Sequence, residues 1–100
     1  MSVQLDLNNP EFQKQWFALT KEDQLSVLAC CQKVAGMEWT GIYRDQGLRW
    51  ELIQSRTGPN QERLYSIRMS RRLRAIVKRS GEFIEFLSLH ADHDSAYRPN

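Results

Sequence analysis

Three runs of residues in the second half of the chain constrain its fold most strongly. Residues 65–69 alternate between apolar and polar side chains, residues 73–78 do so except at Ile76, and residues 83–89 are mostly apolar. An alternation of period two is typical of strands that bury one face. Short turns at residues 70–72 and 80–81 separate the runs. We therefore expect three consecutive strands that form a mainly antiparallel sheet.

The N-terminal part has the pattern of a short strand followed by a helix. Residues 3–7 alternate apolar and polar side chains, which predicts a strand. Asn9 is a favoured N-cap and Pro10 fits the first helical position, so a helix is expected to begin there. Its apolar stripe consists of Phe12, Trp16 and Leu19.

A second helix is expected between Thr20 and Gly36. Thr20 and Asp23 have the spacing of a capping box, with Asp in place of Glu, and Gly36 is a typical helix terminator. The side chains expected to face the core are Val27, Leu28, Cys31, Val34 and Ala35. The two helices would form a hairpin that covers one face of the sheet.

Residues 37–60 are expected to form a loop with a short helical turn at residues 48–53 and a turn at residues 57–60. The length of 100 residues suits one domain, so residues 1–100 are interpreted as a single unit. The expected fold is α+β, with the element order β-α-α-β-β-β and a four-stranded sheet.

Positive charge is concentrated in the middle of the chain. Residues 41–79 contain ten Lys and Arg against three acidic residues, a balance of +7, whereas residues 1–40 total −2 and residues 80–100 total −3. Arg predominates over Lys, which favours bidentate contacts with phosphate. An anionic partner is therefore expected, although a solvated charged surface is the alternative.

Composition and motifs also argue against several classes of protein. The N-terminus lacks the basic and apolar segments of a secretory signal, and no stretch approaches membrane-spanning length, so a cytoplasmic location is expected. Cys30 and Cys31 are adjacent and lack ligand spacing, which favours reduced thiols. The cluster at residues 90–94 offers too few ligands for a stable metal site. We expect no metal and no cofactor.

Four motifs follow one another in a fixed order in the second half. They are Tyr65-Ser66-Ile67-Arg68, Leu73-Arg74-Ala75-Ile76-Val77, Leu87-Ser88-Leu89-His90 and His93-Asp94-Ser95-Ala96-Tyr97-Arg98. Their order and spacing resemble the RelE/ParE superfamily of bacterial toxins. Gly47-Leu48-Arg49-Trp50-Glu51 also resembles the segment that precedes the sheet in that family.

The resemblance implies two N-terminal helices packed on a twisted, mainly antiparallel sheet whose concave side is the active surface. RelE-like members cleave messenger RNA, often in the ribosomal decoding site, and a co-expressed antitoxin that wraps the toxin restrains them. ParE-like members share the fold but inhibit DNA gyrase. Fold alone does not choose between these activities.

Metal-independent RNA cleavage needs a base for the 2′-hydroxyl, cations for the phosphate and an acid for the leaving 5′-oxygen. Arg74 is expected to bind the phosphate, because its planar fork of donors matches two phosphate oxygens. An ion pair with Glu51 or Glu85 is its alternative role. Arg68 is expected on the same sheet face, where it would hold the same or an adjacent phosphate, or be an ordinary solvated strand residue.

His93 and Tyr97 are the expected proton-transfer or positioning groups. An imidazole has an unperturbed pKa of about 6.5 and exchanges protons near neutrality. Tyr97 follows four residues later, so one helical turn would bring both side chains to one side. The alternatives are a turn cap for His93 and packing of the tail onto the sheet for Tyr97.

Four further cations of the basic segment are expected to contact substrate. They are Arg49, Arg71, Arg72 and Lys78, with His90 as a backup participant. His90 alternates with Phe86 and Ser88 and would otherwise be a buried, hydrogen-bonded residue. Trp16, Trp39 and Trp50 either stack on bases or belong to the core.

These observations predict the toxin of a type II toxin–antitoxin system, a metal-independent endoribonuclease that cleaves messenger RNA at the ribosome. Its expected partners are the cognate antitoxin, with which it would form a hetero-oligomer, messenger RNA and the ribosome, with no membrane. Two alternatives stay open. One is a non-catalytic, ParE-like inhibitor of DNA gyrase, and the other is a non-toxic RNA-binding relative.

Overall fold

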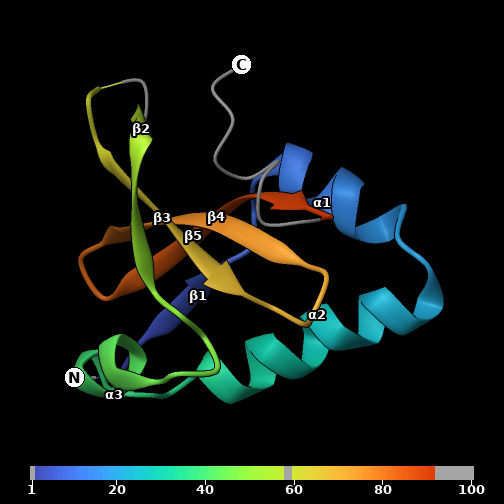
Figure 1. Cartoon of the computed structure of the whole chain (residues 1–100), viewed down its shortest axis with the longest axis horizontal. Coiled ribbons are helices and arrows are strands. Elements are labelled where there is room, and N and C mark those ends of the chain that lie inside the picture. The colour runs from blue at the N-terminus through green and yellow to red at the C-terminus, as the bar shows by residue number, and fades with distance from the viewer. Residues whose placement is uncertain (1, 58–59, 92–100) are drawn as a thin grey trace.

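The computed structural model describes residues 2–57 and 60–91. Its elements, shown in Figure 1, are β1 (Gln4–Asp6), α1 (Pro10–Phe17), α2 (Lys21–Val34), α3 (Trp39–Arg44), β2 (Glu51–Thr57), β3 (Arg63–Arg68), β4 (Arg74–Ser80) and β5 (Phe83–His90). The predicted α+β class is confirmed. The strand at the N-terminus, the two long helices and the three C-terminal strands all lie close to their expected positions.

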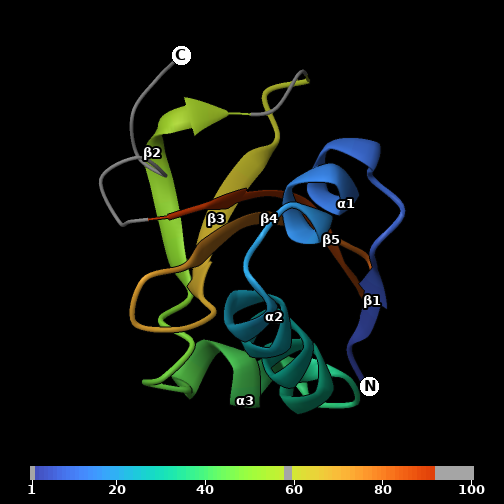
Figure 2. The ribbon, with the colours of Figure 1, turned by 90° about the vertical axis from the view of Figure 1, so that its right-hand side faces the viewer.

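The strands form one five-stranded sheet in the order β1-β5-β4-β3-β2. Strands β2 to β5 pair antiparallel with their neighbours in the chain, and β1 pairs parallel with β5. Figure 2 shows the sheet curving around the helices, which gather on one side of it. The other face, which we call the helix-free face, is not covered by any helix of the described part.

Two apolar clusters show how the strands alternate between these faces. The main core lies between helices and sheet and includes Phe12 of α1, Val27 of α2 and Val77 of β4. A smaller cluster of Ile53, Leu64 and Ile76 lies on the helix-free face. Successive residues of β4 therefore point to opposite faces, as strand geometry requires.

The capping predictions for both long helices are confirmed. The side chain of Asn9 accepts hydrogen bonds from the backbone N–H groups of Glu11 and Phe12, at 2.8 and 3.4 Å. The hydroxyl of Thr20 accepts from the backbone N–H of Asp23 at 3.2 Å. These bonds satisfy N–H groups that have no partner within a helix.

The predicted buried side of α2 is wrong at two positions. Leu28 and Ala35 are exposed, whereas Cys30 is buried. The buried residues are Val27, Cys30, Cys31 and Val34. Their spacing of three, one and three residues follows one helix face, and Leu28 lies about 100° around the helix from Val27, outside that stripe.

The region expected to be a loop contains two elements that the sequence pattern did not predict. Residues Trp39–Arg44 form α3, and Glu51–Thr57 form β2, so the sheet has five strands and not four. The helical turn expected at residues 48–53 is wrong. Arg49 has a φ of 51°, which ends helical geometry, and Glu51 and Leu52 pair with β3. Pairing with a distant strand outweighs local preference here.

Candidate functional site

Arg68, Arg74 and His90 form a row across three neighbouring strands. Arg68 on β3 lies directly opposite Arg74 on β4, and Arg74 lies directly opposite His90 on β5. Residues opposite each other on neighbouring strands share one face. The row lies on the helix-free face, because Ala75, the next residue of β4, belongs to the main core. The expectation that Arg68 and Arg74 share a face is therefore met.

A β-bulge places His90 in this row. Ile76 pairs with Ser88, but the next residue, Val77, pairs with Phe86, so Leu87 is the additional residue. Without a bulge, Phe86 and His90 would point to the same face. With it, Phe86 packs in the main core while His90 faces Arg74 across the strands.

Ser70 forms hydrogen bonds with the guanidinium groups of both arginines in the row. Its carbonyl oxygen accepts hydrogen bonds from Nε of Arg68 and Nη1 of Arg74, both at 3.3 Å. Arg74 Nη1 also donates to the carbonyl oxygen of Leu73 at 3.3 Å. The Ser70 hydroxyl accepts from the backbone N–H groups of Arg72 and Leu73, at 3.3 and 3.2 Å. One turn residue thus contacts both charged side chains and the backbone that follows.

Burial differs along the row. Arg74 is only 8% exposed, whereas Arg68 and His90 are half-buried. His90 Nε2 lies 3.0 Å from the Ser88 hydroxyl. The acidic residues considered as partners of Arg74 have other contacts, since Glu51 lies 3.6 Å from Arg49 and Glu85 lies 3.2 Å from Lys78. Of the two arginines, Arg68 is the more exposed residue.

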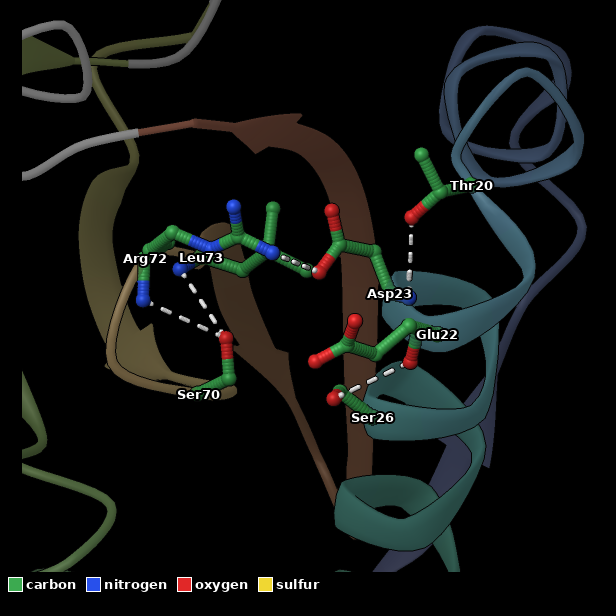
Figure 3. Close-up of polar contacts among 7 residues, drawn as sticks. All are labelled: Thr20, Glu22, Asp23, Ser26, Ser70, Arg72 and Leu73. Carbon is green, nitrogen blue, oxygen red and sulfur yellow. Dashed lines mark hydrogen bonds and ion pairs between the residues drawn. The ribbon is translucent and has the colours of Figure 1, made fainter.

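Arg72 contacts the N-terminal part of α2. Its Nη2 lies 3.1 Å from Oδ1 of Asp23, and Figure 3 shows this pair spanning the space between the β3–β4 turn and the helix. Arg71, the neighbouring residue, is exposed. Four of the six cations between residues 64 and 79 therefore belong to one end of the sheet.

Two adjoining clefts separate this turn from α2. One has a volume of about 490 Å³ and is lined by Glu22, Asp23, Ser26, Ser70, Arg71 and Arg72. The other has a volume of about 440 Å³ and includes Lys33, Arg68 and Arg71 in its lining. Ser26, Ser70 and Arg71 line both clefts. The β3–β4 turn thus lies between the helix-free face and the two clefts beside α2.

Lys78 does not lie beside the row of Arg68, Arg74 and His90. It lies toward the opposite end of β4, where its Nζ contacts carboxylates of Glu62 at 2.6 Å and Glu85 at 3.2 Å. These contacts, led by the hydrogen bond to Glu62, raise the pKa of Lys78. Its charge is therefore matched within the fold.

Arg49 lies beside Arg68. The carbonyl oxygen of Leu48 accepts a hydrogen bond from the backbone N–H of Arg68 at 2.6 Å. The β2–β3 pairing ends at Glu51, which lies opposite Ser66. Arg49 itself has a positive φ of 51°, and its Nε lies 3.6 Å from the Glu51 carboxylate.

The cysteines and tryptophans considered in the sequence lie in structural positions of the fold. Burial raises the pKa of the Cys30 thiol to about 12 and that of Cys31 to about 11, which suppresses the reactive thiolate. Trp39 is buried, and Trp50 stacks on Tyr65 with ring centroids 4.7 Å apart. Within the described ranges, no group of three His, Cys, Asp or Glu side chains is arranged to hold a metal ion.

His93 and Tyr97 lie outside the described residues. Sequence reasoning missed Ser70 and Asp23, which organise the turn between the two arginines. A serine that opens a turn is a recognisable signal for a hydroxyl that accepts backbone hydrogen bonds. The pairing of Asp23 with a residue far along the chain had no local signal.

Among the described residues, no helix is both long and apolar enough to cross a membrane.

Comparison with known proteins supports the fold. No protein-family model and no curated protein sequence matches the chain. The structure is similar to the crystal structure of a copper-bound mutant toxin from Helicobacter pylori, with a TM-score of 0.54 and 12% sequence identity. The match covers 93% of this chain and 97% of that one. At this identity the likeness establishes a shared α+β fold.

Proposed function

We propose that the chain is the toxin of a type II toxin–antitoxin system and cleaves messenger RNA without a metal ion. The proposal rests on the RelE-like motifs, the fold shared with a bacterial toxin and the row of Arg68, Arg74 and His90. The whole chain acts as one toxin domain in the cytoplasm. A co-expressed antitoxin binds it, and the ribosome presents the messenger RNA.

The observation that carries the proposal is the pair of arginines directly opposite each other on neighbouring strands. Like charges at opposite positions of a sheet repel each other. Both guanidinium groups donate to the Ser70 carbonyl oxygen, which brings them close together. A phosphate bound beside the pair would add charge-assisted hydrogen bonds to the guanidinium groups, so the arrangement favours an anion.

In the proposed reaction, the RNA 2′-oxygen attacks the adjacent phosphorus while a base takes the 2′-hydroxyl proton. The new O2′–P bond replaces the P–O5′ bond, and an acid protonates the departing 5′-oxygen. The products are a 2′,3′-cyclic phosphate and a 5′-hydroxyl. Arg68 contacts the phosphate oxygens, and Arg74 reinforces the positive potential from its more buried position. His93 and Tyr97 transfer protons or orient the phosphate, with His90 as a further participant.

Brief induced expression tests this function. Primer extension on cellular messenger RNA should reveal discrete new 5′ ends with the wild-type chain, and these ends should disappear in Arg68→Ala and Arg74→Ala. Lys78→Gln, a cation change away from the row, is the matched control and should still cut. Intact transcripts accompanied by DNA-damage signalling would instead identify a gyrase inhibitor. Salt-dependent RNA binding without cleavage would identify a non-toxic RNA-binding protein.

A further inference from the structure

Asp23 and Arg72 join segments that are 49 residues apart in the chain. The Asp23 carboxylate, 17% exposed, accepts from an Arg72 side chain that is 67% exposed. An ion pair this exposed contributes little to overall stability. Its effect is instead geometric, because it fixes the β3–β4 turn against α2 (Figure 3).

Hydrogen bonds, together with the covalent chain of Arg72 and Ser70, connect this ion pair to the row. Thr20 caps the backbone N–H of Asp23, which holds that residue in the first turn of α2. The backbone N–H of Arg72 donates to the Ser70 hydroxyl. The Ser70 carbonyl then accepts from Arg68 and Arg74. A shift of the turn would therefore displace the acceptor that both guanidinium groups share.

We propose that Asp23 and Arg72 form a latch whose function is to hold Ser70 where its carbonyl oxygen orients Arg68 and Arg74 toward the phosphate. Asp23, Arg72 and Ser70 are thus positioning residues, and Arg72 acts through Asp23 and not through RNA. This assignment replaces the substrate-contacting role expected for Arg72 and rests on the proposed nuclease function. The exposed Arg71 remains available for RNA.

The latch also spans one of the two clefts. Asp23 and Arg72 line opposite sides of the cleft of about 490 Å³, one from α2 and the other from the turn. Loss of their contact would free the turn to move away from the helix. A displacement of about 1 Å at a catalytic group is sufficient to lower a rate on the order of 10²-fold.

Exchanging the charges of Asp23 and Arg72 distinguishes a positioning role of this pair from a direct contact between Arg72 and RNA. Asp23→Arg and Arg72→Asp each place like charges together, and the double variant restores an opposite pair in reversed order. We expect each single variant to lower kcat by about tenfold or more with a smaller change in KM. The double variant should recover most of the lost kcat. A double variant as slow as Arg72→Asp would overturn the proposal, as would single variants with wild-type kcat.

Glu22→Arg is the matched control. Glu22 occupies the same first turn of α2 and lines the same cleft, so this variant makes the same charge change there without removing either member of the pair. The Thr20 cap survives in Asp23→Arg, because it uses a backbone N–H. The control should keep wild-type kcat, and all variants should show the wild-type circular dichroism spectrum. A control as slow as Asp23→Arg would show that the helix terminus, and not the pair, determines kcat.

An NMR readout makes the latch testable without cleavage. The Nε–H signal of Arg68 and the Nη1–H signals of Arg74 report their hydrogen bonds to the Ser70 carbonyl. They should shift in both single variants and return toward their wild-type positions in the double variant. Unmoved signals would refute the latch even if the protein cuts RNA. If the wild-type chain cuts no RNA but the signals follow this pattern, the nuclease function fails and the positional coupling stands.

Discussion

Arg68 and Arg74 face each other across β3 and β4, and both donate to the same carbonyl oxygen at 3.3 Å. Two like charges at directly opposite positions of neighbouring strands repel each other, which costs stability. Functional residues commonly lower the stability of the folded protein, because a binding site is retained for its function and not for maximum stability.

Replacement of Arg68 by Gln should reveal this cost. The variant keeps a hydrogen-bond donor but removes one of two opposed charges, so its free energy of unfolding should stay within about 0.5 kcal/mol of wild type or exceed it. Urea denaturation at low ionic strength measures this. A loss of several kcal/mol would show that Arg68 is a structural residue.

Lys78→Gln should lower stability and leave RNA affinity unchanged. The substitution removes the cation between Glu62 and Glu85, at an expected cost of about 1 kcal/mol. Because the pKa of Lys78 is raised in the folded protein, its contribution is present below pH 10.5 and is lost as pH rises through the higher folded value. Denaturation curves at neutral and alkaline pH check this. A reduced salt dependence of RNA binding would instead assign Lys78 to the substrate surface.

Asp45→Asn should show the opposite pH dependence. The backbone N–H of Leu48 and the Lys33 ammonium both donate to the Asp45 carboxylate, at 2.9 and 3.1 Å, and they lower its pKa. Its contribution is therefore present above pH 3.8 and is lost as pH falls through the lower folded value. The variant should be less stable by about 1 kcal/mol at neutral pH, with the difference vanishing in acid. A difference that persists at low pH would exclude a charge effect.

Gln15→Ala should loosen the end of β5. Strand β1 pairs only with residues 83–85 of β5, and further along the backbone N–H of Leu89 donates to the Gln15 side chain at 2.6 Å. Removing this acceptor leaves a partly buried N–H without its partner, at a cost of about 1–2 kcal/mol. Hydrogen exchange at Leu89 should accelerate. Unchanged exchange would mean that the contact contributes nothing to the edge of the sheet.

The sequence predicted those parts of the fold that depend on local patterns. Asn9 and Thr20 predicted where the two long helices begin. The alternation of side chains around Arg68 and Arg74 predicted that both arginines lie on one face. Strand β2 was missed, because its preference is decided by pairing with β3 and not by its own residues. The bulge at Leu87 was also missed, since no local rule places an extra residue in a strand.

The candidate site also combines features that local patterns predict with features that depend on contacts between distant segments. The two arginines were found from spacing, whereas Asp23 emerges only when the chain brings α2 to the β3–β4 turn. His90 was expected as a backup participant, with burial on the face of Phe86 and Ser88 as its alternative, and the bulge separates it from Phe86. Interactions between distant segments therefore account for what the sequence alone did not predict.

Single-turnover cleavage of ribosome-bound messenger RNA tests the central claim most directly. Wild type should cut at discrete sites, and Arg68→Ala and Arg74→Ala should each slow the cleavage step on the order of 10²-fold while retaining folded spectra. The double variant should lose less than the product of the two effects, because both groups act through one shared acceptor. Folded single variants that cleave at the wild-type rate would contradict the assignment of this arginine pair to the phosphate.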